Sequence, residues 1–148
     1  AGDLAVGWIH ATQDVALSLI NGQLKQGVET ADIGQTRITA DTLTLEVDST
    51  GSVRLGSASN PFVIDVDELI LDVASGAQPM HAVIEDLSDV TIQQMAVSAL
   101  GDLTLRARDD LIYVADTQVL VGSGHLKIES IAGDLSLSGE VGFSKTGI

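Results

Sequence analysis

The sequence predicts an all-β fold, and more narrowly a parallel β-helix (β-solenoid) of about seven coils of roughly 20 residues each. Three observations lead to this prediction. Turn residues are followed repeatedly by short stretches with Leu, Val or Ile at every second position, which is the period of a β-strand. Such stretches recur along the whole chain. The apolar residues, 45% of the sequence, include only 3% aromatics, which suits a narrow interior of stacked aliphatic side chains.

A Gly-Asp-Leu unit opens the clearest of these stretches. It occurs at Gly2-Asp3-Leu4, Gly101-Asp102-Leu103 and Gly133-Asp134-Leu135. Looser copies begin at Asp14, Asp41, Gly51, Asp67 and Asp110. So many copies in 148 residues indicate one repeat module over residues 1–148 rather than a fold built around one site. Because both ends lie in or near a repeat, we expect the module to be a fragment of a much longer chain.

Apolar positions recur at intervals of about 20 residues, the length that one coil of a β-helix needs if each strand pairs with its equivalent about 4.8 Å away. Two series and one further pair show this interval: Leu4, Leu24, Leu43 and Val63; Leu69, Val90, Leu111 and Ile131; Val83 and Leu103. We therefore expect Leu69 beside Val90, and Val90 beside Leu111. Leu103 and Leu105 should face the interior together.

Turn signals separate the predicted strands. Asn60-Pro61 indicates a corner, because Pro61 has no N–H for a stacked strand, and Pro79 indicates a loop around residues 75–79. Asn21-Gly22 is typical of a tight hairpin, which favours the rival fold, an antiparallel β-sandwich repeat of an adhesin. Residues 15–20 and 90–97 contain good helix formers, but both alternate with period two, so strands are the stronger prediction.

The charge balance excludes several classes of partner. The net charge is −14 and the isoelectric point is about 4.1. Such a surface repels nucleic-acid phosphates and anionic membranes. The chain has no cysteine, which excludes disulfides and thiolate sites, and no apolar run of the ~18 residues needed for membrane insertion.

We expect no catalytic, cofactor-binding or metal-binding residue, and no enzyme activity. The three histidines, His10, His81 and His125, have no metal-ligand spacing, and neither a serine nucleophile motif nor a calcium-loop motif occurs. Asp67, Asp89 and Asp110 are spaced so that they could stack along one corner and attract calcium. The stronger interpretation is that each is a solvated turn residue.

Two further charge patterns stand out. Asp65, Glu85, Arg106 and Lys127 have a spacing that predicts a ladder of acids and bases on one face, of small net stability. The doublet Asp109-Asp110, with Arg106 and Arg108 nearby, is similar to the acidic clusters of β-helical polysaccharide lyases. A carbohydrate-active β-helix, either a lyase or a glycan-binding spike, is therefore the alternative function.

Residues 51–69, with Gly51-Ser52-Val53, then Asn60-Pro61 and the strand Val66-Asp67-Glu68-Leu69, resemble segments of filamentous-haemagglutinin-like bacterial exoproteins. The Gly-Asp-Leu stretches at 101–105 and 133–137 resemble the same repeats, and the likeness covers most of residues 41–137. A loop at 76–82 departs from the family pattern. The resemblance implies a right-handed β-helix and a structural or adhesive role outside the cell, whereas the residues alone leave the handedness open.

From these observations we expect a segment of an adhesin or surface-fibre stalk. Its expected partners are neighbouring coils or further copies end to end, together with a glycan or protein receptor on a host or surface. The resemblance carries over no catalytic residues.

Overall fold

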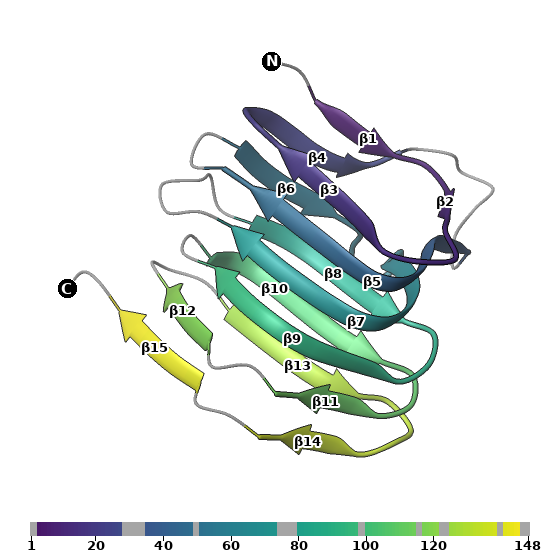
Figure 1. Ribbon diagram of the computed structural model, residues 1–148. Coiled ribbons are helices and arrows are strands. Elements are labelled where there is room, and N and C mark those ends of the chain that lie inside the picture. The colour runs from purple at the N-terminus through teal and green to yellow at the C-terminus, as the bar shows by residue number, and fades with distance from the viewer. Residues whose placement is uncertain are drawn as a thin grey trace.

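The fold was analysed in a computed structural model, which describes residues 3–27, 35–48, 51–73, 80–97, 100–114, 117–121, 125–138 and 141–145 (Figure 1). Within these ranges the backbone forms only strands, turns and bends, so the all-β prediction is confirmed. Every pairing between the described strands is parallel, as a solenoid requires. The two segments for which a helix was the weaker prediction, 15–20 and 90–97, contain strands β3 (Val15–Leu19) and β9 (Val90–Val97).

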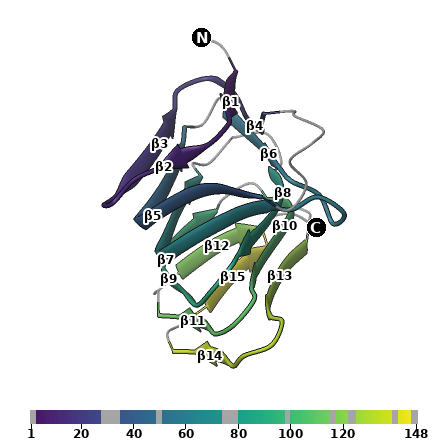
Figure 2. The same cartoon turned by 90° about the vertical axis from the view of Figure 1, so that its right-hand side faces the viewer.

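The strands stack in two main series that follow one another around the coil (Figures 1 and 2). The first series is β1 (Leu4–Val6), β4 (Gly22–Gln26), β6 (Gly51–Leu55), β8 (Met80–Asp86), β10 (Leu100–Ala107) and β13 (His125–Ser130). The second is β2 (Ile9–His10), β3 (Val15–Leu19), β5 (Thr36–Val47), β7 (Phe62–Val73), β9 (Val90–Val97), β11 (Leu111–Tyr113), β12 (Thr117–Val121), β14 (Leu135–Leu137) and β15 (Val141–Lys145). The long strand β7 connects the series, because it pairs with β8 at its start and with β9 further along.

The number of coils differs from the predicted seven. The solenoid has about four turns, namely β4–β5, β6–β7, β8–β9 and β10–β12, which are stacked on both sides, with β1–β3 and β13–β15 flanking them. The cause is the unequal length of the coils. In the series that begins with β1, Asp3 and Gln23 directly precede the paired residues Leu4 and Leu24, and they are separated by |i−j| = 20 along the chain. The next register partners, Gln23 and Ser52, are separated by 29, and Asp102 and His125 are separated by 23.

The predicted equivalences are therefore partly right. Leu4 pairs with Leu24 and Val90 with Leu111, as expected. Leu69 pairs with Ile92 rather than with Val90. The other expected neighbours are also wrong: Leu24 pairs with Val53, Leu43 with Leu69, Val63 with Thr36, Val83 with Thr104 and Leu111 with Leu135. A uniform period fails because the coils differ in length and because the register shifts by a residue within three of the strand pairings.

The core consists of aliphatic columns that run along the solenoid axis. Leu43, Leu69 and Ile92 lie in register on β5, β7 and β9, and all three are at most 2% exposed. Leu103 and Leu105 are 1% and 2% exposed, which confirms that they face inward together. Each such side chain contributes roughly 1.5–3 kcal/mol by leaving water. These columns hold neighbouring coils at the spacing that their backbone hydrogen bonds require.

Corners join the two series. Asn21 (φ 65°) and Gly22 (φ 92°) have the left-handed backbone of a tight turn, but β3 and β4 on either side of them pair with other strands, so the hairpin alternative is wrong. The expected corner at Asn60-Pro61 is confirmed, closed by Ser57 N–H donating to Asn60 O at 2.8 Å. Pro79 and residues 74–78 lie outside the described residues. Met80–Ala82 belong to β8, so the loop expected at 76–82 ends earlier.

Candidate functional sites

The strongest charge cluster lies on the outer face of β8, β10 and β13. Glu85, only 6% exposed, binds Arg106 through Oε2 (2.6 Å to Nε) and Arg108 through Oε1 (2.8 Å to Nε). Burial works to raise the pKa of Glu85, but the hydrogen bonds from Arg108 and Arg106 outweigh it and hold the pKa below its usual value. The cluster therefore connects adjacent coils as a charged clamp.

The predicted ladder of Asp65, Glu85, Arg106 and Lys127 is only partly correct. Glu85 and Arg106 are register partners and form an ion pair. Asp65 pairs with Thr39, and Lys127 pairs with Thr104 while its Nζ lies 2.5 Å from Glu129 Oε2. Arg106 and Arg108 are engaged by Glu85, so the cluster proposed for them with Asp109-Asp110 does not form.

A column of corner aspartates does exist, but with different members from those predicted. Asp89 Oδ1 accepts the Asp110 N–H at 3.0 Å, and Asp110 Oδ1 accepts the Asp134 N–H at 2.7 Å. Asp67 lies within β7, exposed, and is not part of this column. The carboxylates of Asp89 and Asp110 each satisfy a backbone donor of the next coil, which is the role of a turn residue. Asp134 was missed because its separation from Asp110 is 24, longer than the separation of 21 between Asp89 and Asp110.

Two of the three histidines flank one aspartate. His81, Asp102 and His125 are register neighbours on β8, β10 and β13. Asp102 Oδ1 lies 3.0 Å from His125 Nδ1, and Asp102 Oδ2 lies 3.9 Å from His81 Nδ1. All three side chains are largely exposed, so solvent screens their interaction. His10, in β2, pairs with Thr39 away from this column.

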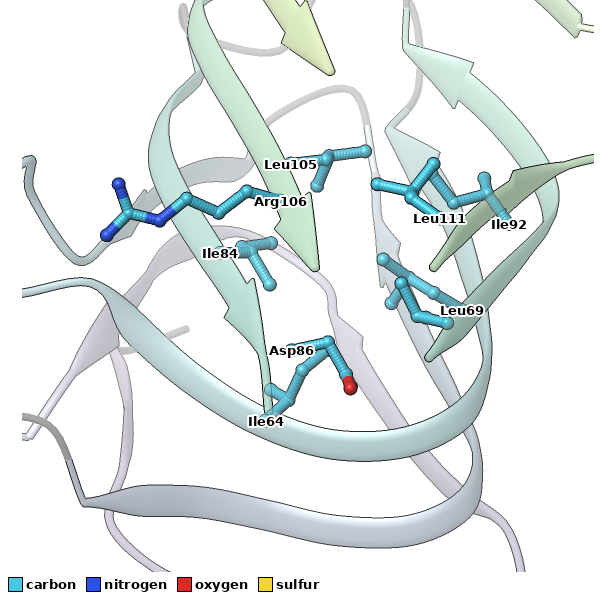
Figure 3. A pocket seen from close by; sticks show the side chains of 9 residues that line it. Ile64, Leu69, Ile84, Asp86, Ile92, Leu105, Arg106 and Leu111 are labelled. Carbon is cyan, nitrogen blue, oxygen red and sulfur yellow. The ribbon is translucent and has the colours of Figure 1, made fainter. Parts of the chain in front are cut away.

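Asp86, the last residue of β8, is a buried carboxyl group, 1% exposed. Its Oδ2 accepts the Val66 N–H at 2.9 Å, and its Oδ1 accepts the Ser88 N–H at 2.8 Å. It lines a small internal cavity of about 10 Å³, among Ile64, Ile84 and other aliphatic side chains. Figure 3 shows Asp86 directed into the interior and the guanidinium group of Arg106 directed away from it.

An open groove lies at the corner after β3. It is lined by Ser18, Leu19, Ile20, Glu46, Val47, Asp48 and Asp72. Glu46 and Asp72 are register partners on adjacent strands, so two carboxylates sit one strand apart. The groove is acidic, and nothing in its hydrogen bonding marks a particular ligand.

The single tryptophan and the single tyrosine lie in very different surroundings. Tyr113, in β11, is fully buried. Trp8 is 51% exposed, and the guanidinium carbon of Arg37 lies 5.8 Å from the centroid of its ring. Arg37 is itself buried, so it fixes the ring position by a cation–π contact.

Compared with models of known families, with curated proteins and with solved structures, the chain matches none of them. Among the described residues, no three His, Asp or Glu side chains are grouped so that they could hold a metal ion. A search of the same residues finds no helix with the length and apolar character to cross a membrane.

Proposed function

We propose that the chain is a structural and adhesive segment of a large secreted or surface-displayed bacterial protein, such as an adhesin or fibre stalk. The parallel solenoid supports this proposal, because strands paired on both edges and stacked on aliphatic columns make a stiff rod. The charge of −14 keeps the sides of such rods apart. The resemblance of residues 51–69 to filamentous-haemagglutinin-like repeats points in the same direction.

The observation that carries the proposal is the exposure of apolar side chains in the two end coils of the solenoid. In the last described coil Ile131, Leu135 and Leu137 are 56%, 45% and 60% exposed. Leu4 and Trp8, in the first coil, are 36% and 51% exposed. Apolar side chains beside unpaired strand edges favour the addition of further strands. The proposed partners are therefore neighbouring coils or a second copy placed end to end, in addition to a surface receptor.

A carbohydrate-active β-helix is the alternative of a different class. It requires aromatic side chains on which a sugar ring can stack, next to acidic and basic groups. The burial of Tyr113 and the engagement of Arg106 and Arg108 by Glu85 weigh against it. Export from a bacterial cell and an extracellular location are part of the main proposal.

Light scattering with small-angle X-ray scattering tests the proposal on the whole chain. We expect association that grows with sodium chloride, because salt screens the repulsion between acidic rods, and particles that lengthen without thickening. Leu137→Lys places a charge on the end coil and should abolish this association. Val114→Lys is the matched control, because Val114 is 40% exposed but lies at a corner of an inner coil. Equal effects of the two substitutions, or particles that thicken, would contradict end-to-end contact.

A further inference from the structure

We propose that Asp86, Ser88 and Asp65 form a proton-operated clasp between the β6–β7 and β8–β9 coils, in which one added proton turns both contacts of the Ser88 hydroxyl into hydrogen bonds. The clasp is a device for regulating the stiffness of the solenoid at one corner. It goes beyond the structural role proposed above and does not depend on the end coils.

The geometry of the three side chains provides the first argument. Ser88 Oγ lies 3.2 Å from Asp86 Oδ1 and 3.3 Å from Asp65 Oδ1. A hydroxyl group carries a single proton, so Ser88 can donate to only one of the two carboxylates at a time. When both aspartates are ionised, the other oxygen–oxygen contact joins two acceptors and is unfavourable.

One proton taken from water removes this conflict without any movement of the backbone. A protonated Asp86 donates to Ser88 Oγ, and the Ser88 hydroxyl donates to Asp65 Oδ1, so both contacts become hydrogen bonds. The proton comes from a hydronium ion, whose O–H bond breaks as the O–H bond of Asp86 forms, and no other covalent bond changes. The backbone donors at Val66 and Ser88 continue to point at Asp86 in both states.

The position of the clasp makes its protonation matter to the fold. Asp86 binds the Val66 N–H of the β6–β7 coil, and its own carbonyl oxygen accepts the Arg108 N–H of the next coil at 3.0 Å. Directly beside it, Leu87 N–H donates to Ile64 O at 3.0 Å. Three coils therefore meet at this corner, and ionisation of Asp86 changes the electrostatic surroundings of the hydrogen bonds that join them.

Burial is the main factor that favours the neutral form of Asp86, and one neighbouring charge acts in the same direction. From β7, the carboxylate of Asp65 opposes ionisation, whereas Asp67 is exposed. Glu85 binds both Arg106 and Arg108 on the outer face. At the following corner, the Asp89 carboxylate binds the Asp110 N–H. Burial raises the pKa of Asp86 to about 6, although hydrogen bonds from Ser88 and Val66 act in the opposite direction.

The sign of the pH effect follows from this shift. The folded state keeps the Asp86 proton up to about pH 6, whereas the ordinary pKa of the group is 3.8. Stability from this group is therefore greatest in acid and falls as the pH rises through 6. Between pH 5 and 7.5, linkage predicts a loss of roughly tenfold in the folding equilibrium constant.

The experiment is a titration of the Asp86 carboxyl carbon by NMR between pH 5 and 7.5, in the whole chain and in two variants. We expect a midpoint near 6 in the unchanged protein. Asp65→Asn should lower this midpoint, because it removes the competing charge while keeping an acceptor for Ser88. Asp67→Asn is the matched control, since it removes a charge from the same strand at an exposed position and should leave the midpoint in place.

The shared proton is tested by repeating Asp65→Asn in a Ser88→Ala background. If Ser88 connects the two carboxyl groups, the shift caused by Asp65→Asn shrinks when the hydroxyl is absent. Equal shifts in both backgrounds would reduce the effect to simple repulsion and overturn the clasp, as would an Asp86 midpoint below pH 5. If Ser88→Ala unfolds the corner, the comparison of Asp65→Asn with Asp67→Asn still measures the effect of the Asp65 charge on Asp86. The Asp65→Asn variant should fold, because Asp65 is only half-buried.

Discussion

Replacement of Leu103 by alanine tests whether the inward columns hold the coils together. Leu103 is 1% exposed and lies in register between Ala82 and Leu126. Leucine-to-alanine changes in cores cost about 2–5 kcal/mol, the upper values applying where the surroundings cannot collapse. Here the neighbouring coils are fixed by backbone hydrogen bonds on both sides, and Ala82 is too small to fill the space. We therefore expect a loss of about 3–4 kcal/mol.

The assay is urea denaturation followed by far-UV circular dichroism. Thr104→Ala is the matched control, because Thr104 is the next residue of β10 and points to the outer face; it should change the stability by no more than about 0.5 kcal/mol. Leu103→Asp should abolish folding, since it adds an unpaired charge to an apolar column. If Leu103→Ala costs less than about 1 kcal/mol, or if Thr104→Ala costs as much, the assignment of the two faces is refuted.

Four further predictions concern the charged side chains. A double-mutant cycle of Glu85→Gln and Arg106→Gln should show a coupling energy of about 0.5–3 kcal/mol at pH 7, and additive effects would contradict the clamp. Because its pKa is lowered, Glu85 stabilises the fold above its ordinary value of 4.5, and this contribution should be lost as the pH falls through its folded pKa. Asp110→Ala should expose the Asp134 amide to faster hydrogen exchange, whereas Asp67→Ala should not. Calcium at matched ionic strength should change the melting temperature no more than sodium chloride does, and a saturable calcium effect would contradict the turn role of Asp89 and Asp110.

The fold class could be predicted from the sequence because strand period and turn chemistry are local signals. Leu103 and Leu105 alternate with polar residues, and their inward orientation needs no knowledge of other coils. The number of coils depends on distant pairings instead. With apolar residues at 45% of positions, a partner one assumed period away can be found almost anywhere by chance. Val83 shows the consequence: it was matched to Leu103 but pairs with Thr104, and a slip of one residue exchanges the two faces.

Some partners within the charged clusters could likewise be predicted from the sequence, and others could not. Glu85 and Arg106 were matched correctly because their true separation, |i−j| = 21, is close to the assumed period. Asp65 and Lys127 were misplaced because the preceding and following coils differ in length. The pairing of His125 with Asp102 carries no local motif, since the two residues belong to different coils. Contacts between residues of different coils can be predicted only when the number of residues in each coil is known.

Asp86 is the clearest case of a property that sequence cannot supply. In the chain it stands at the end of a strand, directly before Leu87 and Ser88, where a solvated turn aspartate is expected. Its burial depends on Val66 and Ile64, which belong to the preceding coil, and on the following coil, which contributes Leu105 and Leu111. A buried carboxylate that accepts backbone hydrogen bonds keeps two coils in register, but its ionisation costs free energy, mainly because the group is buried and to a smaller extent because Asp65 is near. The same contacts that fix the corner therefore make its stability depend on pH.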